Sequence, residues 1–145
     1  MNCMKNEDLV VEYILNAPVD AVWNAITDPV KMKQWYFDIP DFKPVPGLEF
    51  QFTAGSENKK YVHLCKIKES IPLQKLSYTW RYNDLPGNTL VTFELFNEGE
   101  KTKVRLTHQG LETFPQDQPD FRRQSFENGW TELIGKNLKA FLEKK

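Results

Sequence analysis

The chain has 145 residues, the length of one domain, and its 40% hydrophobic content is enough for a core of its own, so we expect a single domain over residues 1–145. Nineteen Lys and Arg against 20 Asp and Glu leave a net charge of −1, and nucleic acid is not an expected partner because binding to phosphates needs surplus cations. Two cysteines cannot build a multi-bridge framework, and no apolar run approaches the roughly 20 residues of a membrane span. The opening residues lack the apolar core of a signal peptide, so we expect a reduced, cytoplasmic protein without membrane insertion.

The first elements predicted along the chain are a strand and two short helices. Residues 1–7 are expected to be a disordered N-terminus. The β-branched run Leu9–Leu15 predicts a strand that ends before Pro18. Apolar residues recur at helical spacing after Pro18, which predicts a helix, and Asp28 followed by Pro29 predicts the start of a second one.

A series of antiparallel strands is predicted after a proline-rich loop over residues 38–46. Apolar and polar residues alternate with period two in five segments, which span residues 48–53, 61–71, 76–82, 91–95 and 104–108. Short turns rich in Gly, Asn and Pro separate these segments, and strands joined in this way pair antiparallel.

The last part of the chain predicts one long helix. Its apolar residues are spaced three and four apart: Phe126, Trp130, Leu133, Ile134, Leu138, Phe141 and Leu142. Gly129 and Gly135 each cost this helix about 1 kcal/mol relative to Ala, so we expect them to permit close packing or to border a cavity. We therefore predict an α+β fold: a curved antiparallel β-sheet gripping a long C-terminal α-helix, with two short helices after the first strand.

Several segments, in their order and spacing, resemble one known superfamily. They are Ala17–Trp35, Pro44–Phe50, Ile71–Trp80, Val91–Leu95, Thr102–Leu111 and Gly129–Leu142. Together they resemble the START-like (SRPBCC, helix-grip) superfamily, and within it the branch of activator of heat-shock-protein-90 ATPase homologue-like proteins. The resemblance covers nearly the whole chain and implies a cavity between sheet and helix. Many members of the superfamily bind lipids, sterols or polyketides there, some are cyclases or hydrolases, and the eponymous activators are co-chaperones.

Motifs for covalent, metal or cofactor chemistry are missing from the sequence. His63 and His108 are the only histidines, and neither has further ligands at metal spacing, so no metal site is predicted. Cys65 follows His63 on one strand face, about 7 Å away and too far for a direct hydrogen bond, so we expect a buried free thiol. No Gly-rich phosphate loop opens a helix, and no cofactor is expected. No catalytic residue is assigned, and the sequence favours a non-enzymatic role.

The candidate ligand cavity consists of aromatic and histidine residues on the apolar faces of the predicted elements. Its predicted residues are Trp35, Phe50, Phe52, His63, Tyr78, Trp80, Phe93, His108, Phe126 and Trp130. Simple core packing is the alternative for each of them. Tyr78, His108 and the indole N–H of Trp80 are expected either to orient a ligand or to bond protein neighbours. Phe37 and Phe42, in the loop from Tyr36 to Pro46 with its three prolines, indicate a stiff edge at the cavity mouth or a protein-docking patch.

Three functions are compatible with these observations. The first is binding of a small hydrophobic ligand, such as a lipid, sterol or aromatic metabolite, in the cavity. The second is a co-chaperone-type module that stimulates a cytosolic chaperone of the heat-shock-protein-90 class. The third is a cavity enzyme, cyclase- or hydrolase-like, with His63 or His108 as acid or base. The exposed edge of the predicted sheet would also allow a homodimer.

Overall fold

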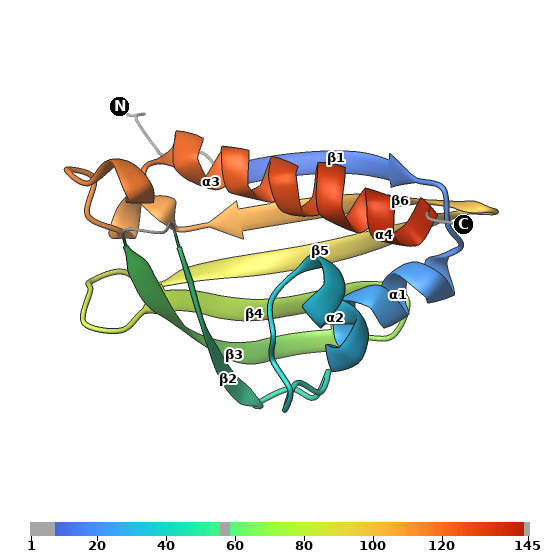
Figure 1. Cartoon of the computed structure of the whole chain (residues 1–145), viewed down its shortest axis with the longest axis horizontal. Helices are drawn as coiled ribbons and strands as arrows, with labels where there is room; N and C mark the ends of the chain where they lie inside the picture. The colour runs from blue at the N-terminus through green and yellow to red at the C-terminus, as the bar shows by residue number, and fades with distance from the viewer. Residues whose placement is uncertain (1–7, 56–58, 144–145) are drawn as a thin grey trace.

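The computed structural model describes residues 8–55 and 59–143, so the predicted disorder of residues 1–7 and the predicted turn over residues 56–58 lie outside the described residues. Figure 1 shows one sheet, two short helices near one end and a long C-terminal helix lying across the sheet. The elements in chain order are β1 (Leu9–Leu15), α1 (Val19–Thr27), α2 (Pro29–Trp35), β2 (Glu49–Gly55), β3 (Lys60–Ile71), β4 (Lys75–Tyr82), β5 (Thr89–Glu98), β6 (Lys101–Gln109), η1 (Leu111–Thr113), η2 (Pro119–Phe121), α3 (Arg123–Trp130), η3 (Thr131–Leu138) and α4 (Lys139–Glu143). The predicted α+β fold is confirmed.

The six strands form one sheet in the order β1-β6-β5-β4-β3-β2, and every neighbouring pair is antiparallel. Strands β1 and β2 are its two edges, and α1 and α2 carry the chain from one edge to the other. The helices lie on one face of the sheet, so this face and the C-terminal helix enclose the core (Figure 1).

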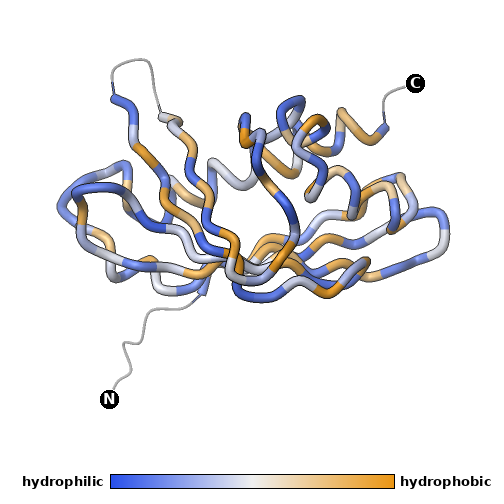
Figure 2. The backbone as a smooth tube through the Cα atoms, turned by 90° about the horizontal axis from the view of Figure 1, so that it is seen from below, coloured by the Kyte–Doolittle hydropathy of each residue, from blue (hydrophilic) through white to orange (hydrophobic). Residues whose placement is uncertain are grey.

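The period-two pattern of the strands determines which side chains enter this core. In β4, Leu76, Tyr78, Trp80 and Tyr82 are all at most 5% exposed. The alternation of apolar and polar residues along the strands is visible in Figure 2. Successive strand residues point to opposite faces, so one face of β4 supplies three large aromatic rings to the interior.

Helices α1 and α2 begin where their residues predict. Pro18 precedes α1 in an extended conformation, and Pro29 is the first residue of α2. The side chain of Asp28 accepts a hydrogen bond of 3.0 Å from the backbone N–H of Val30, which caps α2. Trp35 then ties the two helices together, because its indole N–H donates to the carbonyl of Ala25 in α1 at 2.8 Å.

The C-terminal helix is continuous in direction but not uniform in winding. Its central part, η3, is π-helical, whereas a regular α-helix was expected from the apolar spacing. Phe126, Trp130, Ile134 and Leu138 are its buried residues, each four positions after the last. An α-helix would rotate such a series by about 40° at every step, since 3.6 residues make a turn. The wider π-helical turns offset this rotation and keep the series facing the sheet.

One glycine of η3 makes close packing against the sheet edge possible. A Cβ at Gly135 would lie 2.8 Å from Cε1 of Tyr13 in β1, closer than two carbons can approach without a shift. The Tyr13 hydroxyl donates to the side chain of Thr131 at 3.2 Å, which holds its ring against the helix. The expected packing role of a helix glycine is therefore observed at position 135. Within the described part of the chain, no helix is both long enough and apolar enough to cross a membrane.

Candidate functional site: a cavity between the sheet and the C-terminal helix

A cavity of about 280 Å³ lies where β2 ends, β3 begins and β4 ends, and η2, α3 and the start of η3 form its opposite wall. The residues that line it are Phe37, Ala54, Gly55, Tyr61, His63, Trp80, Tyr82, Asp120, Phe121, Ser125, Phe126, Gly129, Trp130 and Leu133. Seven of these fourteen residues are Phe, Tyr or Trp. A concave, mainly aromatic wall with a few polar groups is the usual composition of a small-molecule site.

Gly129 provides room on the helix side of this cavity. A Cβ added there would meet no described atom within 4 Å, in contrast to one at Gly135. Gly129 is exposed on the helix and lines the cavity. The expected cavity role of a helix glycine is thus observed at position 129.

His63 is enclosed by aromatic rings. Its imidazole stacks on Phe52 at 4.4 Å between centroids and meets Trp80 and Tyr82 edge-on at 5.0 and 4.7 Å. Burial lowers the pKa of His63 to about 4, although hydrogen bonding to the backbone of Tyr61 and of Phe52 opposes part of this shift. Because a carbonyl can only accept, the 3.1 Å contact places the proton on Nδ1 and leaves Nε2 as an acceptor.

The Tyr82 ring lies next to this imidazole, with 4.7 Å between the centroids. The indole N–H of Trp80 donates to the Tyr82 hydroxyl oxygen at 2.9 Å. That oxygen is therefore an acceptor in the protein, and among residues 8–55 and 59–143 the Tyr82 hydroxyl donates no hydrogen bond of its own. Burial raises the pKa of Tyr82 far above its usual value, so this hydroxyl remains a proton donor at neutral pH.

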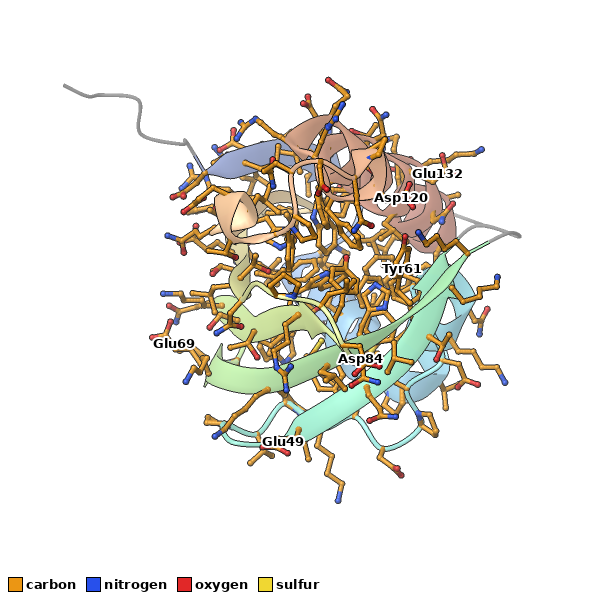
Figure 3. The ribbon with its side chains drawn as sticks, turned by 90° about the vertical axis from the view of Figure 1, so that its left-hand side faces the viewer. Glu49, Tyr61, Glu69, Asp84, Asp120 and Glu132 are labelled. Atoms are coloured by element: carbon orange, nitrogen blue, oxygen red, sulfur yellow. The ribbon has the colours of Figure 1, made fainter. Side chains whose placement is uncertain are left out.

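The mouth of the cavity is bridged by a tyrosine and a carboxylate. The Tyr61 hydroxyl at the start of β3 donates to Oδ2 of Asp120 in η2 at 2.9 Å, and Figure 3 shows the two residues side by side. Burial, and then the hydrogen bond to Asp120, raise the pKa of Tyr61 to about 12. The pair connects the sheet to the segment before α3 across the opening.

His108 lies outside the cavity wall and is completely buried in a chain of hydrogen bonds. The Thr89 hydroxyl donates to the Trp80 carbonyl at 2.6 Å, so it must accept from Nε2–H of His108 at 2.8 Å. Nδ1 of His108 in turn accepts from the indole N–H of Trp130 at 3.1 Å. Burial lowers the pKa of His108 to about 3. A neutral imidazole satisfies every bond in this chain, which joins the C-terminal helix to β4, β5 and β6.

A second polar contact lies in the core at Tyr78. Its hydroxyl and that of Tyr36 are 2.6 Å apart, and burial raises the pKa of both phenols well above the usual value. The three polar groups expected to orient a ligand, on Tyr78, His108 and Trp80, therefore all bond to protein neighbours.

The structure divides the ten predicted site residues into two groups. Four line the cavity: His63, Trp80, Phe126 and Trp130. Six lie in the surrounding packed interior: Trp35, Phe50, Phe52, Tyr78, Phe93 and His108. The participation of any of the ten in ligand binding stays a prediction.

Several residues that line the cavity were not among the predicted site residues. Some of them could have been recognised from the pattern of the sequence. Tyr82 continues the alternation of Tyr78 and Trp80, and Tyr61 is two residues before His63, so both belong to faces already recognised. Asp120 and Ser125 lie in a segment without periodicity, and nothing in the sequence indicates that the chain returns them to β3.

The two aromatic residues of the proline-rich loop behave differently. Phe37 lines the cavity, as an edge at its mouth would, and stacks on Phe52 at 4.3 Å. Phe42 is 2% exposed and packs edge-on against Phe50 at 5.1 Å, so it belongs to the core. A docking patch formed by both rings is therefore wrong, because Phe42 is not at the surface.

The chemistry available in the cavity is hydrogen bonding within an apolar environment. With a pKa of about 4, His63 is neutral at pH 7 and a weak general base. Cys65 is a buried free thiol, and burial raises its pKa, so little thiolate forms at neutral pH. In the described ranges, no three His, Cys, Asp or Glu side chains gather as metal ligands would.

The curved antiparallel sheet, the helix that it grips and the apolar cavity between them define a START-like, helix-grip domain. The chain belongs to the family described as activator of Hsp90 ATPase homolog 1-like protein, whose model matches residues 16–143. No curated protein matches the sequence.

Solved structures with the same fold come from several bacteria. Protein MLL2253 from Mesorhizobium loti is similar with a TM-score of 0.76 and 29% identity over 96% of this chain and 98% of that one. Mll3558 protein from Rhizobium loti has a TM-score of 0.80 and 20% identity, over 94% and 96% of the two chains. DynU16, a protein of the dynemicin biosynthetic locus, has a TM-score of 0.78 and 21% identity over 97% of this chain and 48% of its own.

Proposed function

We propose that this protein is a cytoplasmic domain that binds a small apolar ligand in the cavity between β2–β4 and α3. The observation that carries the proposal is the cavity of about 280 Å³ between the sheet and the C-terminal helix, in which seven of the fourteen lining residues are aromatic. With about 280 Å³, the cavity suits a ligand of one to three rings.

The polar groups of the cavity are suited to orienting a ligand. Nε2 of His63 can accept one hydrogen bond, and the Tyr82 hydroxyl can donate one, so a ligand with a complementary pair of groups would satisfy both. The network around His108 lies behind this wall and holds the Trp130 ring in place, while the Trp80 indole is held by its bond to Tyr82. Rigid rings of this kind lower the ordering cost of binding.

The experiment is a titration with N-phenyl-1-naphthylamine, a neutral apolar fluorophore, followed by probe and tryptophan emission. We expect saturable one-to-one binding to the wild-type protein. Gly129→Leu places a side chain in the cavity and should weaken probe binding at least about tenfold without lowering the melting temperature. Asn128→Leu is the matched control, since Asn128 is exposed on the same helix turn and does not line the cavity. Unchanged probe binding in Gly129→Leu would contradict the proposal.

Family membership supports a second candidate, stimulation of a cytosolic chaperone ATPase of the Hsp90 class. The measurement is ATP hydrolysis by such a chaperone at increasing concentrations of this protein. A rate increase that Gly129→Leu leaves intact would indicate a function of the outer surface. An unchanged rate at saturating protein would remove this candidate.

A further inference from the structure

The cavity has an uneven charge distribution. Among the described residues that line it, Asp120 is the only one with a charge at neutral pH, because His63 with its pKa of about 4 is neutral and no Lys or Arg contributes to the wall. The carboxylate lies at the mouth, where the hydroxyl of Tyr61 holds it at 2.9 Å (Figure 3). A ligand that enters therefore meets one negative charge and no positive one on the cavity wall.

Three rings pack together behind this carboxylate. Tyr61 meets Phe121 edge-on at 5.0 Å and Tyr82 at 5.7 Å, and Phe121 lies 5.0 Å from Tyr82. Aromatic faces carry negative charge density and attract ammonium groups within about 6 Å. The Tyr61 ring already has such a contact, since Nζ of Lys59, which does not line the cavity, is 5.8 Å from its centroid.

The interior and the mouth thus favour different ends of one molecule. The inner wall, with Trp80, Phe126 and Trp130, accepts an apolar or aromatic body. The mouth, with Asp120 beside the Tyr61 and Phe121 rings, favours a positive group and disfavours a carboxylate, which would face Asp120 without a compensating cation on the wall.

We infer that the ligand of this cavity is an aromatic amine, bound with its ring system inside and its protonated ammonium group at Asp120. This inference rests on the proposed function and adds the charge class of the ligand. It separates the cavity from one that binds fatty acids or other organic anions, for which a Lys or Arg in the cavity wall would be expected, whereas Lys59 contacts the Tyr61 ring from outside the lining.

The test uses three compounds with the same indole ring and two-carbon arm: tryptamine, tryptophol and indole-3-acetate. Each competes with bound N-phenyl-1-naphthylamine at low ionic strength. We expect tryptamine to displace the probe at a concentration about tenfold below that of indole-3-acetate, with tryptophol between them. Added salt should weaken the binding of tryptamine more than that of tryptophol, because salt screens the attraction between charges.

Asp120→Asn tests the assigned group. This variant should weaken the binding of tryptamine about three- to fivefold and change the affinity for tryptophol by no more than about twofold. Asp117→Asn is the matched control, an exposed aspartate of the same loop that does not line the cavity, and it should change neither. Asp120 is itself exposed, so the substitution leaves the core intact, and a melting curve checks this.

The outcomes separate this inference from the proposed function. Indole-3-acetate that competes as well as tryptamine, or a tryptamine affinity that Asp120→Asn does not change, would overturn the amine assignment while ligand binding stands. A bound probe that none of the three compounds displaces also contradicts the assignment. If the probe itself does not bind the wild-type protein, the proposed function fails, and the amine assignment fails with it.

Discussion

Two halves of the C-terminal helix face the same sheet in different ways. In η3, Gly135 has the Tyr13 ring so close that a methyl group would not fit without a shift. In α3, Gly129 is exposed and lines the cavity, and a methyl group added there would meet no described atom within 4 Å. Two identical residues, both unfavourable for a helix, thus serve opposite purposes. The comparison shows that a glycine within a helix can mark either a close contact or the border of a cavity. The surface opposite the glycine determines which of the two is present.

His108 of β6, which bonds Trp130 where these halves meet, is expected to have the largest effect on stability. His108→Ala removes a buried ring and leaves the Trp130 indole N–H and the Thr89 hydroxyl without their partner. We expect a loss of about 4 kcal/mol in the free energy of unfolding, measured with urea.

His63→Ala is the matched comparison, because His63 is also a buried histidine but borders the cavity. The loss of unfolding free energy in His63→Ala should be smaller, about 2 kcal/mol, because one side of the His63 ring already faces the cavity. An equal or larger loss of unfolding free energy in His63→Ala would mean that the surroundings of His63 are packed as tightly as those of His108.

Acid should destabilise the protein through both imidazoles. Their pKa values in the folded state are about 4 for His63 and about 3 for His108, below the usual 6.5, so the unfolded chain binds protons first as pH falls. The stabilisation is fully present above pH 6.5 and is lost as the pH falls toward 3 to 4. Between pH 6 and pH 4, each imidazole should lower the free energy of unfolding by about 1.4 kcal/mol per pH unit.

His108→Gln keeps a side-chain donor and removes one of these two titrations. The slope of unfolding free energy against pH should therefore fall by one proton relative to the wild-type protein. An unchanged slope would show that His108 is not buried in its neutral form.

The two glycines give the most direct test of the comparison. Gly135→Ala should destabilise by about 1–2 kcal/mol, since the shift of Tyr13 outweighs the gain in helix propensity. Gly129→Ala should stabilise by up to about 1 kcal/mol, because the methyl group enters open space. Thermal and urea unfolding of both variants would measure the difference. Equal changes in stability at the two positions would refute the contrast between a closely packed Gly135 and an open Gly129.

A pair of tyrosines gives the smallest expected difference. Tyr78→Phe removes the hydrogen bond between the Tyr36 and Tyr78 hydroxyls in the packed interior, and we expect a loss of about 1–2 kcal/mol in the free energy of unfolding. Tyr61→Phe removes a bond to the exposed Asp120 at the mouth, and the loss should stay below about 1 kcal/mol. Urea unfolding distinguishes the two, and a larger loss for Tyr61→Phe would mean that the mouth contributes more to folding than the interior contact.

The order of the main helices and strands, the curved antiparallel sheet and the family could all be predicted from the amino-acid sequence. These depend on local properties: period-two alternation in β4, the Asp28–Pro29 helix start and short turns between strands, each of which is visible within a few residues. The inward face of each strand was equally predictable, because a strand has only two faces and the polar one must meet water.

Which parts of the interior are filled and which are open could not be predicted, because this depends on how distant segments pack together. His108 and Trp80 share apolar strand faces, yet Trp80 borders the cavity while His108 is enclosed behind it, bonded to a helix residue 22 positions away. The packing of Tyr13 against Gly135, and the return of Asp120 to Tyr61, likewise join residues 122 and 59 positions apart in the sequence. Cavities are determined by the sum of side-chain volumes from several elements, and no single segment of sequence carries that sum.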